Sequence, residues 1–256
     1  MLLPVVAGVL FGAIIGSFLN VVILRLPEGR SLVHPRSCCP GCGAPVAWYD
    51  NVPIVSYAWL GARCRACRGR ISARYPLVEA LTAALFGCSV VRFGLTIDLA
   101  AALVLLSALV AITFIDLDHR IIPNEISLPG IPVGLVLGSL RATVGPRAAI
   151  VGMLLGGGVL FAIAYGYEKV RRREGMGMGD VKLLALIGAF LGWHGVLVTM
   201  LVSSTVGSVI GLAAMIRHRE TLQLAIPFGP FLALGAAVHL FWGEEWIAWY
   251  LSLSTV

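Results

Sequence analysis

The chain is dominated by long apolar stretches separated by shorter polar ones. Eight such stretches lie near residues 3–24, 76–95, 98–115, 126–141, 148–166, 181–193, 195–216 and 222–243. A helix of about 20 apolar residues is long enough to cross the hydrocarbon core of a bilayer. The pattern therefore predicts an all-α, polytopic membrane protein with about eight transmembrane helices.

The stretch 181–216 tests this count, because basic residues follow it and precede it. As one straight helix its 36 residues would be about 54 Å long, against a hydrocarbon core of about 30 Å. A break at Gly192-Trp193-His194-Gly195 permits a hairpin of two helices instead. The first arm has only about 13 residues, or roughly 20 Å. We therefore expect it to begin below the membrane surface, within protein or a water-filled cavity.

Composition and charge agree with a membrane location and orient the chain. Apolar residues make up 59% of the chain and charged ones 12%, with a mean hydropathy of +0.93. Membrane lipid is therefore an expected partner. Of the 19 Lys and Arg residues, 16 lie in the alternate segments 25–75, 116–125, 167–182 and 217–220. By the positive-inside rule these segments are cytoplasmic and the N-terminus is periplasmic. The net charge of +6 is then a topology signal, and we expect no nucleic-acid partner.

The first 24 residues contain neither Lys nor Arg, and Arg25 follows the first apolar stretch. A cleaved secretory signal has its positive charge before the apolar stretch. We therefore expect residues 3–24 to be a retained membrane span.

Four cysteines in the first cytoplasmic segment have the spacing of a metal site. Cys39 and Cys42 form one C-x2-C pair, Cys64 and Cys67 form another, and 21 residues separate the pairs. Four thiolates suit a closed, structural zinc ion, and a reducing cytoplasm disfavours disulfides. A redox pair and a loop without metal remain alternatives. The segment 25–75 is predicted to be a small zinc-binding domain that depends on the metal for much of its stability.

Two aspartates lie at the ends of apolar stretches on the side predicted to be cytoplasmic. Asp116 ends the third stretch and Asp180 precedes the sixth. A carboxylate at membrane depth is costly and is a functional candidate by default. Two adjacent carboxyl groups can share one proton, so that one activates water while the other polarises a carbonyl. Asp118 is nearer the loop and on another helix face, so Asp116 and Asp180 are the predicted catalytic pair.

Glycines surround several of these candidates. Gly175, Gly177 and Gly179 precede Asp180 and allow compact backbone with positive φ. The nucleotide-binding patterns that such a run suggests are not matched. Gly12 and Gly16 have the GxxxG spacing of close helix packing. The run Gly156-Gly157-Gly158 suggests close packing as well.

Three polar residues near the predicted cytoplasmic ends of the first two spans remain open to two interpretations. Asn20, Arg25 and Glu79 are candidates for contact with a substrate or cofactor. The alternative is ordinary polarity at helix ends, and no residue is assigned to a cofactor.

Together these blocks resemble the bacterial type IV prepilin peptidases, a family of membrane aspartic proteases with a GxGD motif. The matching blocks are GSFLNVVILRLP from Gly16, the two CxxC pairs, ISARYPLVEALT from Ile71, FIDLDHRIIPN, GMGMGDVKLL and AIPFGPFLALG from Ala225. The resemblance covers nearly the whole chain. One position departs from it, since Asn124 stands where Asp is frequent, and we expect little consequence.

The resemblance implies catalytic roles for Asp116 and Asp180 and metal ligation by the four cysteines. It implies an enzyme of the bacterial inner membrane with its active site facing the cytoplasm. Its substrates would be type IV prepilins and pseudopilins, cleaved after a glycine that ends their basic leader. The new N-terminal residue, usually Phe, would then be N-methylated with S-adenosylmethionine. Residues 1–95 would hold the methyltransferase part and residues 96–256 the peptidase.

Two other functions share some of these features. A presenilin-type intramembrane protease also has GxGD and paired aspartates, but the cysteine loop and FIDLDHRIIPN favour the prepilin family. A proton-coupled transporter would use intramembrane carboxylates, but its sites usually lie near the membrane midplane.

Overall fold

Helices make up most of the structure, a computed structural model that describes residues 2–171, 177–218 and 227–253. Within these ranges there is no β-strand, only two isolated β-bridges. The chain divides into two compact units, Met1–Leu99 and Ala100–Val256. The all-α class is thus confirmed. Gly175 and the beginning of the predicted stretch 222–243 lie outside the described residues.

The first unit is built on two long helices packed against each other. α1 (Leu2–Arg25) contacts α3 (Arg74–Phe93) along a row of glycines. A Cβ at Gly12 would lie 2.8 Å from the Cα of Ala83, and one at Gly16 would lie 2.7 Å from the Cα of Glu79. The backbones of α1 and α3 therefore touch where the sequence predicted close packing at Gly12 and Gly16.

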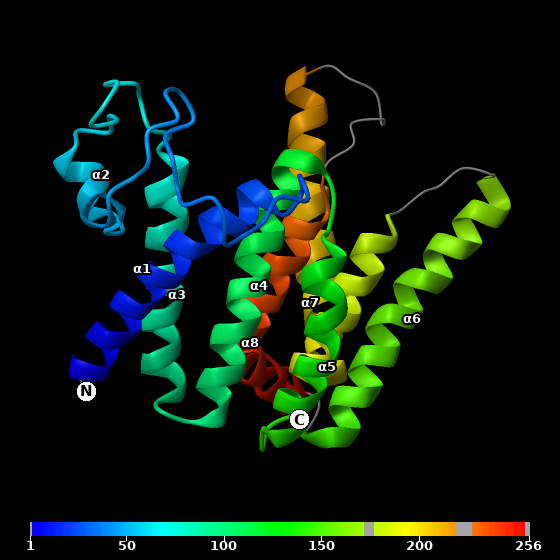
Figure 1. Cartoon of the computed structure of the whole chain (residues 1–256). Coiled ribbons are helices and arrows are strands. Elements are labelled where there is room, and N and C mark those ends of the chain that lie inside the picture. Colours follow the sequence, from blue (N-terminus) through cyan, green and yellow to red (C-terminus); the bar gives the residue numbers. More distant parts are fainter. Residues whose placement is uncertain (1, 172–176, 219–226, 254–256) are drawn as a thin grey trace. The chain divides into compact units, whose positions relative to one another are not determined.

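Between α1 and α3 runs a loop with two short helical pieces. These are the 3-10 turn η1 (Trp48–Asn51) and the five-residue helix α2 (Val55–Trp59). Figure 1 shows this loop in blue and cyan, largely as irregular chain. A loop with so little regular structure needs cross-links to hold its shape.

The second unit is organised around α7 (Met178–His218), which contacts α5 (Asn124–Leu140), α6 (Gly145–Arg171) and α8 (Gly229–Leu253). α4 (Ile97–His119) leads into this unit. In Figure 1, α5, α6 and α7 lie side by side in green and yellow. After its first charged turn, α7 is apolar on all sides over residues 183–190 and almost fully buried: Leu183, Leu184, Leu186, Ile187, Ala189 and Phe190 are each at most 1% exposed. A helix that is apolar all round is the expected centre of a bundle.

α7 is interrupted at Gly192, within the tetrapeptide where the sequence predicted a break. Gly192 has φ 71° and ψ −176°, a conformation open to glycine and strained for other residues. The break removes helical partners from nearby carbonyl groups. Arg141 is buried and donates from Nη1 to the carbonyl oxygen of Phe190 at 3.0 Å. Arg141 is one of the three Lys and Arg residues outside the segments predicted to be cytoplasmic, and it satisfies a backbone acceptor near the break.

α6 and α7 approach each other backbone to backbone through two glycines. A Cβ at Gly188 would collide with the carbonyl group of Gly152 and lie 2.9 Å from the Met153 nitrogen. Gly156 packs on the carbonyl of Leu184. In contrast, a Cβ at Gly158 would meet no atom within 4 Å. Close packing at the run Gly156-Gly157-Gly158 is therefore confirmed at its first member and not at its last.

This crossing makes a testable prediction with a matched control in α6. Gly188→Leu must separate two backbones, and we expect it to destabilise the folded protein by about 3 kcal/mol, at the upper end for overpacked sites. Gly158→Leu adds the same side chain in open space and should change stability by less than about 0.5 kcal/mol. Thermal unfolding of both purified variants in one detergent measures the difference. Equal midpoints for the two variants would contradict the backbone contact.

Five helices in the described residues are long and apolar enough to cross a membrane: α1, α3, α4, α6 as far as Tyr167, and α7 as far as Ile216. Each of the eight predicted stretches does correspond to a helical segment, since α7 has two arms and α5 and α8 complete the set. α5 has only 17 residues and two internal prolines. That all eight segments cross the membrane remains a prediction.

Candidate active site and metal site

Asp116 is a buried carboxylate near the end of α4, with 5% of its surface exposed. Its Oδ2 accepts a hydrogen bond from the backbone N–H of Gly229 at 3.0 Å. Gly229 is the first residue of α8, and the N-terminus of a helix favours negative charge. Asp118 is exposed, on another face of α4. Asp116 is therefore buried and Asp118 exposed, on different faces of α4 as the sequence predicted.

Gly229 is a contact of Asp116 that sequence reasoning missed. A Cβ at this position would lie 2.6 Å from the Asp116 Oδ2, so any side chain would displace the carboxylate. Gly229-Pro230 is a recognisable helix start, since proline suits the first helical turn. That signal could have located the beginning of α8. It could not have identified a partner 113 positions earlier in the chain.

Asp180 lies in the first turn of α7 and is half-buried. The two described glycines of the GxGD motif differ in their surroundings. A Cβ at Gly179 would lie 2.9 Å from the Cβ of Ile122, whereas one at Gly177 would have no neighbour closer than 3.9 Å. Gly179 therefore lets α7 approach the segment that follows α4. Asp180 is then close enough to Asp116 for electrostatic interaction between their carboxyl groups.

A side-chain contact also joins α7 to the beginning of α5. Lys182 Nζ donates a hydrogen bond to Asn124 Oδ1 at 2.8 Å, across 58 positions in the sequence. Asn124 is the first residue of α5. Specific contacts therefore link the helix ends near the two aspartates. Asp116 of α4 is bonded to the beginning of α8, and the beginning of α7 is bonded to the beginning of α5.

The four predicted cysteine ligands come together in the first unit. The sulfur atoms of Cys39, Cys42, Cys64 and Cys67 all lie within 4.8 Å of one another, and Cys39 Sγ is 3.8 Å from Cys67 Sγ. A tetrahedral zinc ion with Zn–S bonds of about 2.3 Å requires sulfur atoms about 3.8 Å apart. This donor set and spacing fit zinc. Cys38 and Cys88 are not part of the cluster.

The two C-x2-C pairs are held by equivalent turns. The N–H of Cys39 donates to the Ala44 carbonyl at 2.9 Å, and the N–H of Cys64 donates to the Gly69 carbonyl at 2.8 Å. Each turn contains a residue with left-handed backbone one place after its second cysteine, Gly43 with φ 70° and Arg68 with φ 59°. Between the two turns, only the cysteines and the backbone geometry recur.

The backbone of the first turn favours a thiolate. Hydrogen bonds from the N–H groups of Cys42 and Gly41 lower the pKa of Cys39 to about 7. The N–H of Ala44 lowers the pKa of Cys42, but the neighbouring cysteines, Cys67 foremost, outweigh it and raise that pKa to about 11. Crowded thiols therefore resist complete ionisation by themselves. A divalent cation would remove this conflict, because metal ligation requires thiolates.

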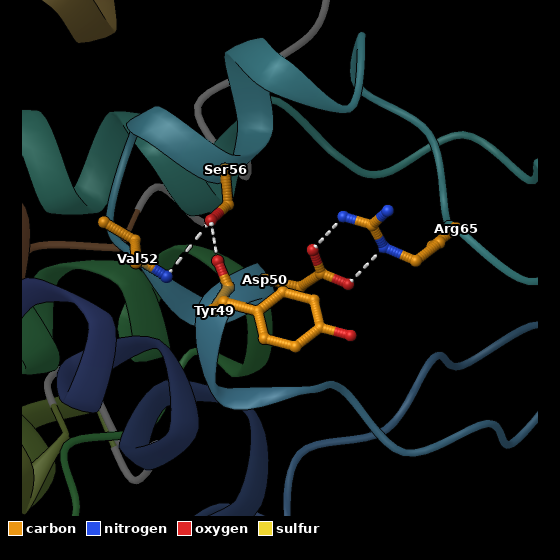
Figure 2. A network of polar contacts seen from close by, with 5 residues as sticks. All are labelled: Tyr49, Asp50, Val52, Ser56 and Arg65. Atoms are coloured by element: carbon orange, nitrogen blue, oxygen red, sulfur yellow. Dashed lines mark hydrogen bonds and ion pairs between the residues drawn. The ribbon is translucent and has the colours of Figure 1, made fainter.

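Polar contacts tie the second turn to η1, as Figure 2 shows. Arg65 donates from Nε and Nη2 to the two carboxylate oxygens of Asp50, at 2.8 and 2.6 Å. These hydrogen bonds hold the pKa of Asp50 below its usual value. Ser56 Oγ accepts the N–H of Val52 and donates to the Tyr49 carbonyl. The network fixes η1 and α2 beside the cysteine cluster.

The three polar residues that the sequence left with two interpretations all make specific contacts in the first unit. Asn20 is buried and its Nδ2 donates to the Tyr75 carbonyl at 3.1 Å. Glu79 is buried and its Oε2 accepts the N–H of Ile54 at 2.8 Å. Arg25 donates from Nη1 to the Ser31 carbonyl at 3.0 Å. Asn20 and Glu79 are thus interior groups, which ordinary helix-end polarity does not explain.

Two family comparisons cover most of the chain. Residues 10–93 match the bacterial peptidase A24 N-terminal domain, and residues 103–212 match the type IV leader peptidase family. No solved structure matches.

Several relatives share the name prepilin leader peptidase/N-methyltransferase. The relative from Aeromonas salmonicida (strain A449) is 41% identical over 95% of this chain and 92% of its own length. The one from Pseudomonas aeruginosa is 36% identical over 98% of this chain and 94% of its own. The one from Myxococcus xanthus (strain DK1622) is 45% identical over 83% of this chain and 64% of its own. Matches of this identity and coverage, together with the family comparison, show that the chain belongs to the type IV leader peptidase family.

Proposed function

We propose that this protein removes the basic leader of type IV prepilins and pseudopilins by aspartic protease chemistry and then N-methylates the new N-terminus. The observation that carries the proposal is the buried Asp116, which accepts the Gly229 N–H and interacts electrostatically with Asp180. The shared name of the relatives supports both activities.

We assign different roles to the two carboxyl groups, and their contacts support this assignment. The N–H of Gly229 and the start of α8 stabilise negative charge on Asp116. Asp116 is therefore the ionised base that takes a proton from water. Asp180 interacts electrostatically with that charge and keeps its proton, since two close carboxylates do not both ionise readily. It donates a hydrogen bond to the scissile carbonyl, and Asp116 passes its proton to the departing amine as the tetrahedral intermediate collapses.

We assign a structural zinc ion to Cys39, Cys42, Cys64 and Cys67. Four protein ligands leave no open position, so this metal holds the loop and takes no part in cleavage. S-adenosylmethionine, when bound, supplies the methyl group. We assign the methyltransferase part to residues 1–95 and the peptidase to residues 96–256.

The proposal includes a location in the bacterial inner membrane with eight spans. α7 crosses as a hairpin, the N-terminus is periplasmic, and the active site faces the cytoplasm. The burial of Arg141 supports this orientation. It leaves only Arg92 and Arg147 as exposed cations in the segments assigned to the outside. The short first arm of α7 suggests that Asp180 is recessed below the membrane surface.

One experiment tests both activities. The purified protein in detergent is incubated with a prepilin and isotopically labelled S-adenosylmethionine, and the N-terminus of the product is determined by mass spectrometry. We expect removal of the leader after its glycine and one labelled methyl group on the new terminal nitrogen. Cleavage within the apolar helix of the substrate would favour an intramembrane protease and overturn the proposal. An intact substrate would overturn it as well.

A further inference from the structure

The first unit contains a pocket that the cleavage chemistry does not use. Its volume is about 300 Å³, and it is lined by Ile14, Ser17, Phe18 and Val21 of α1 and by Asn51 and Pro53 of the loop. A cavity of about 150 Å³ suffices for benzene. This pocket therefore has room for an aromatic side chain together with the backbone atoms that carry it.

A buried carboxyl group lies behind one wall of this pocket. Glu79 Oε2 accepts the N–H of Ile54 at 2.8 Å, and its carboxyl group interacts with the side chain of Ser17, which itself lines the pocket. Gly16 permits this arrangement, because any larger residue would push α1 away from the Cα of Glu79. Ser17 thus lines the pocket with one side chain that also interacts with Glu79.

Both of these partners are neutral, and Glu79 forms no ion pair within the described part of the chain. A buried carboxylate without a cation is costly and is seldom retained without a role. The site also contains backbone strain. Ile54 is a β-branched residue with φ 62°, a conformation that such residues rarely adopt. Its N–H points to Glu79, so the strained loop holds the carboxyl group in place.

We propose that this pocket binds the new N-terminal residue of the cleaved substrate, with its apolar side chain against Ile14 and Phe18 and its α-ammonium group at Ser17. Glu79 accepts, through the Ser17 hydroxyl, the proton that the nitrogen must lose before it can be methylated. The inference rests on the proposed function and identifies the acceptor site of its second reaction.

The chemical step balances with a sulfonium methyl donor as co-reactant. One N–H bond of the ammonium group breaks, Ser17 receives that proton and its own proton passes to the Glu79 carboxylate. The freed lone pair forms the new N–C bond with the methyl carbon. The S–CH₃ bond breaks and its electron pair stays on sulfur, which leaves a neutral thioether. The donor loses its positive charge, which the methylated nitrogen now carries as a secondary ammonium group, and Glu79 releases the proton it accepted to solvent.

The charge of the pocket favours an amine over a lipid tail. An acyl chain would fit the apolar lining but would leave Glu79 without a countercharge. An ammonium group supplies that charge, and positioned general bases typically accelerate reactions by about 10²–10⁴-fold. Binding of an amine can therefore be distinguished experimentally from occupation of the pocket by an apolar chain.

The first measurement needs no methyl donor. Binding of a synthetic peptide with the mature pilin N-terminus is compared with binding of its N-acetylated form, using the full-length protein in detergent. We expect the free amine to bind about tenfold more tightly, a difference of about 1.4 kcal/mol. Glu79→Gln should remove that preference, and Ser17→Ala should weaken it. Glu28→Gln, an exposed carboxyl-to-amide change in the same unit, is the matched control and should preserve it.

The second measurement uses the same precleaved peptide with the methyl donor, so the peptidase is bypassed. We expect Glu79→Gln to lower the methylation rate about 100-fold and to abolish its acid limb in the pH profile. Leader removal from an intact prepilin should remain at the wild-type rate, which also shows that the variant is folded. If Glu79→Gln does not fold, Ser17→Ala carries the same comparison. Wild-type amine preference and methylation in both variants would overturn the proposal, as would a copurified lipid that the peptide does not displace.

Discussion

Asp116→Asn and Asp180→Asn will each lower the rate of leader removal by about 10⁴-fold or more, because groups that act as a unit lose most of their effect when either is changed. An amide in place of the Asp116 carboxylate can neither accept a proton from water nor carry the charge that the Gly229 N–H stabilises. An amide in place of the Asp180 carboxyl group lacks the acidic proton that polarises the carbonyl. The amide oxygen of the first variant can still accept the 3.0 Å hydrogen bond from Gly229, so the fold should survive.

Asp118→Asn is the matched control for this pair. It removes the same charge two residues from Asp116 but from an exposed position. We expect its rate to stay within about twofold of wild type, as for an ordinary surface change. The rates are measured on purified variants with a full-length prepilin, by mass spectrometry of the product. Processing at a normal rate by either Asn variant of the pair would falsify the dyad. A large loss of rate in Asp118→Asn would show that Asp118 also takes part in cleavage.

The paired change Cys39→Ser and Cys42→Ser will remove zinc from the purified protein. The two remaining sulfurs, from Cys64 and Cys67, cannot complete a tetrahedral site. Structural zinc sites contribute about 10–16 kcal/mol of apparent binding free energy in small domains. The loop has only η1 and α2 as regular structure, so it should also lose its fold. Elemental analysis measures the zinc content, and limited proteolysis measures the exposure of residues 37–71.

The control removes the two thiols that lie outside the cluster. Cys38→Ser with Cys88→Ser changes the same number of cysteines, and Cys38 adjoins the first ligand directly. Zinc content and proteolysis should match those of the wild type. Stoichiometric zinc in the first double variant would refute the assignment. Loss of zinc in the control alone would show that Cys38 is a ligand in place of a cysteine of the predicted set.

Local patterns in the sequence predicted most of the secondary structure and identified the candidate residues. Apolar stretches about one membrane thickness long indicated where helices form, since burial in lipid requires backbone groups to bond within each helix. The paired CxxC spacing indicated a metal site, because two cysteines on one tight turn can reach one ion. The break at Gly192 was also readable, since a helix from Val181 to Ile216 would be too long for one crossing.

Helix limits were less predictable at the end of the chain's last helix. The last predicted apolar stretch ended at Gly243. α8 instead continues to Leu253, with Trp246, Trp249 and Tyr250 exposed along it. Two glutamates lower the local hydropathy without breaking a helix, because Glu has a high helix propensity. Hydropathy therefore indicated where the apolar part ends and not where the helix ends.

By itself the sequence determined the class of protein and the helical segments, and it identified the four clustered cysteines and the two candidate aspartates, because each depends on residues close together in the chain or on the spacing of a motif. Only the tertiary structure decided which distant groups support them. Gly229 reaches Asp116 across 113 positions, Lys182 reaches Asn124 across 58, and Glu79 reaches Ile54 across 25. Such contacts depend on how helix surfaces fit together, as at Gly152 and Gly188, where the absence of a side chain brings two backbones into contact. That fit is a property of two surfaces at once, and no single segment of sequence contains it.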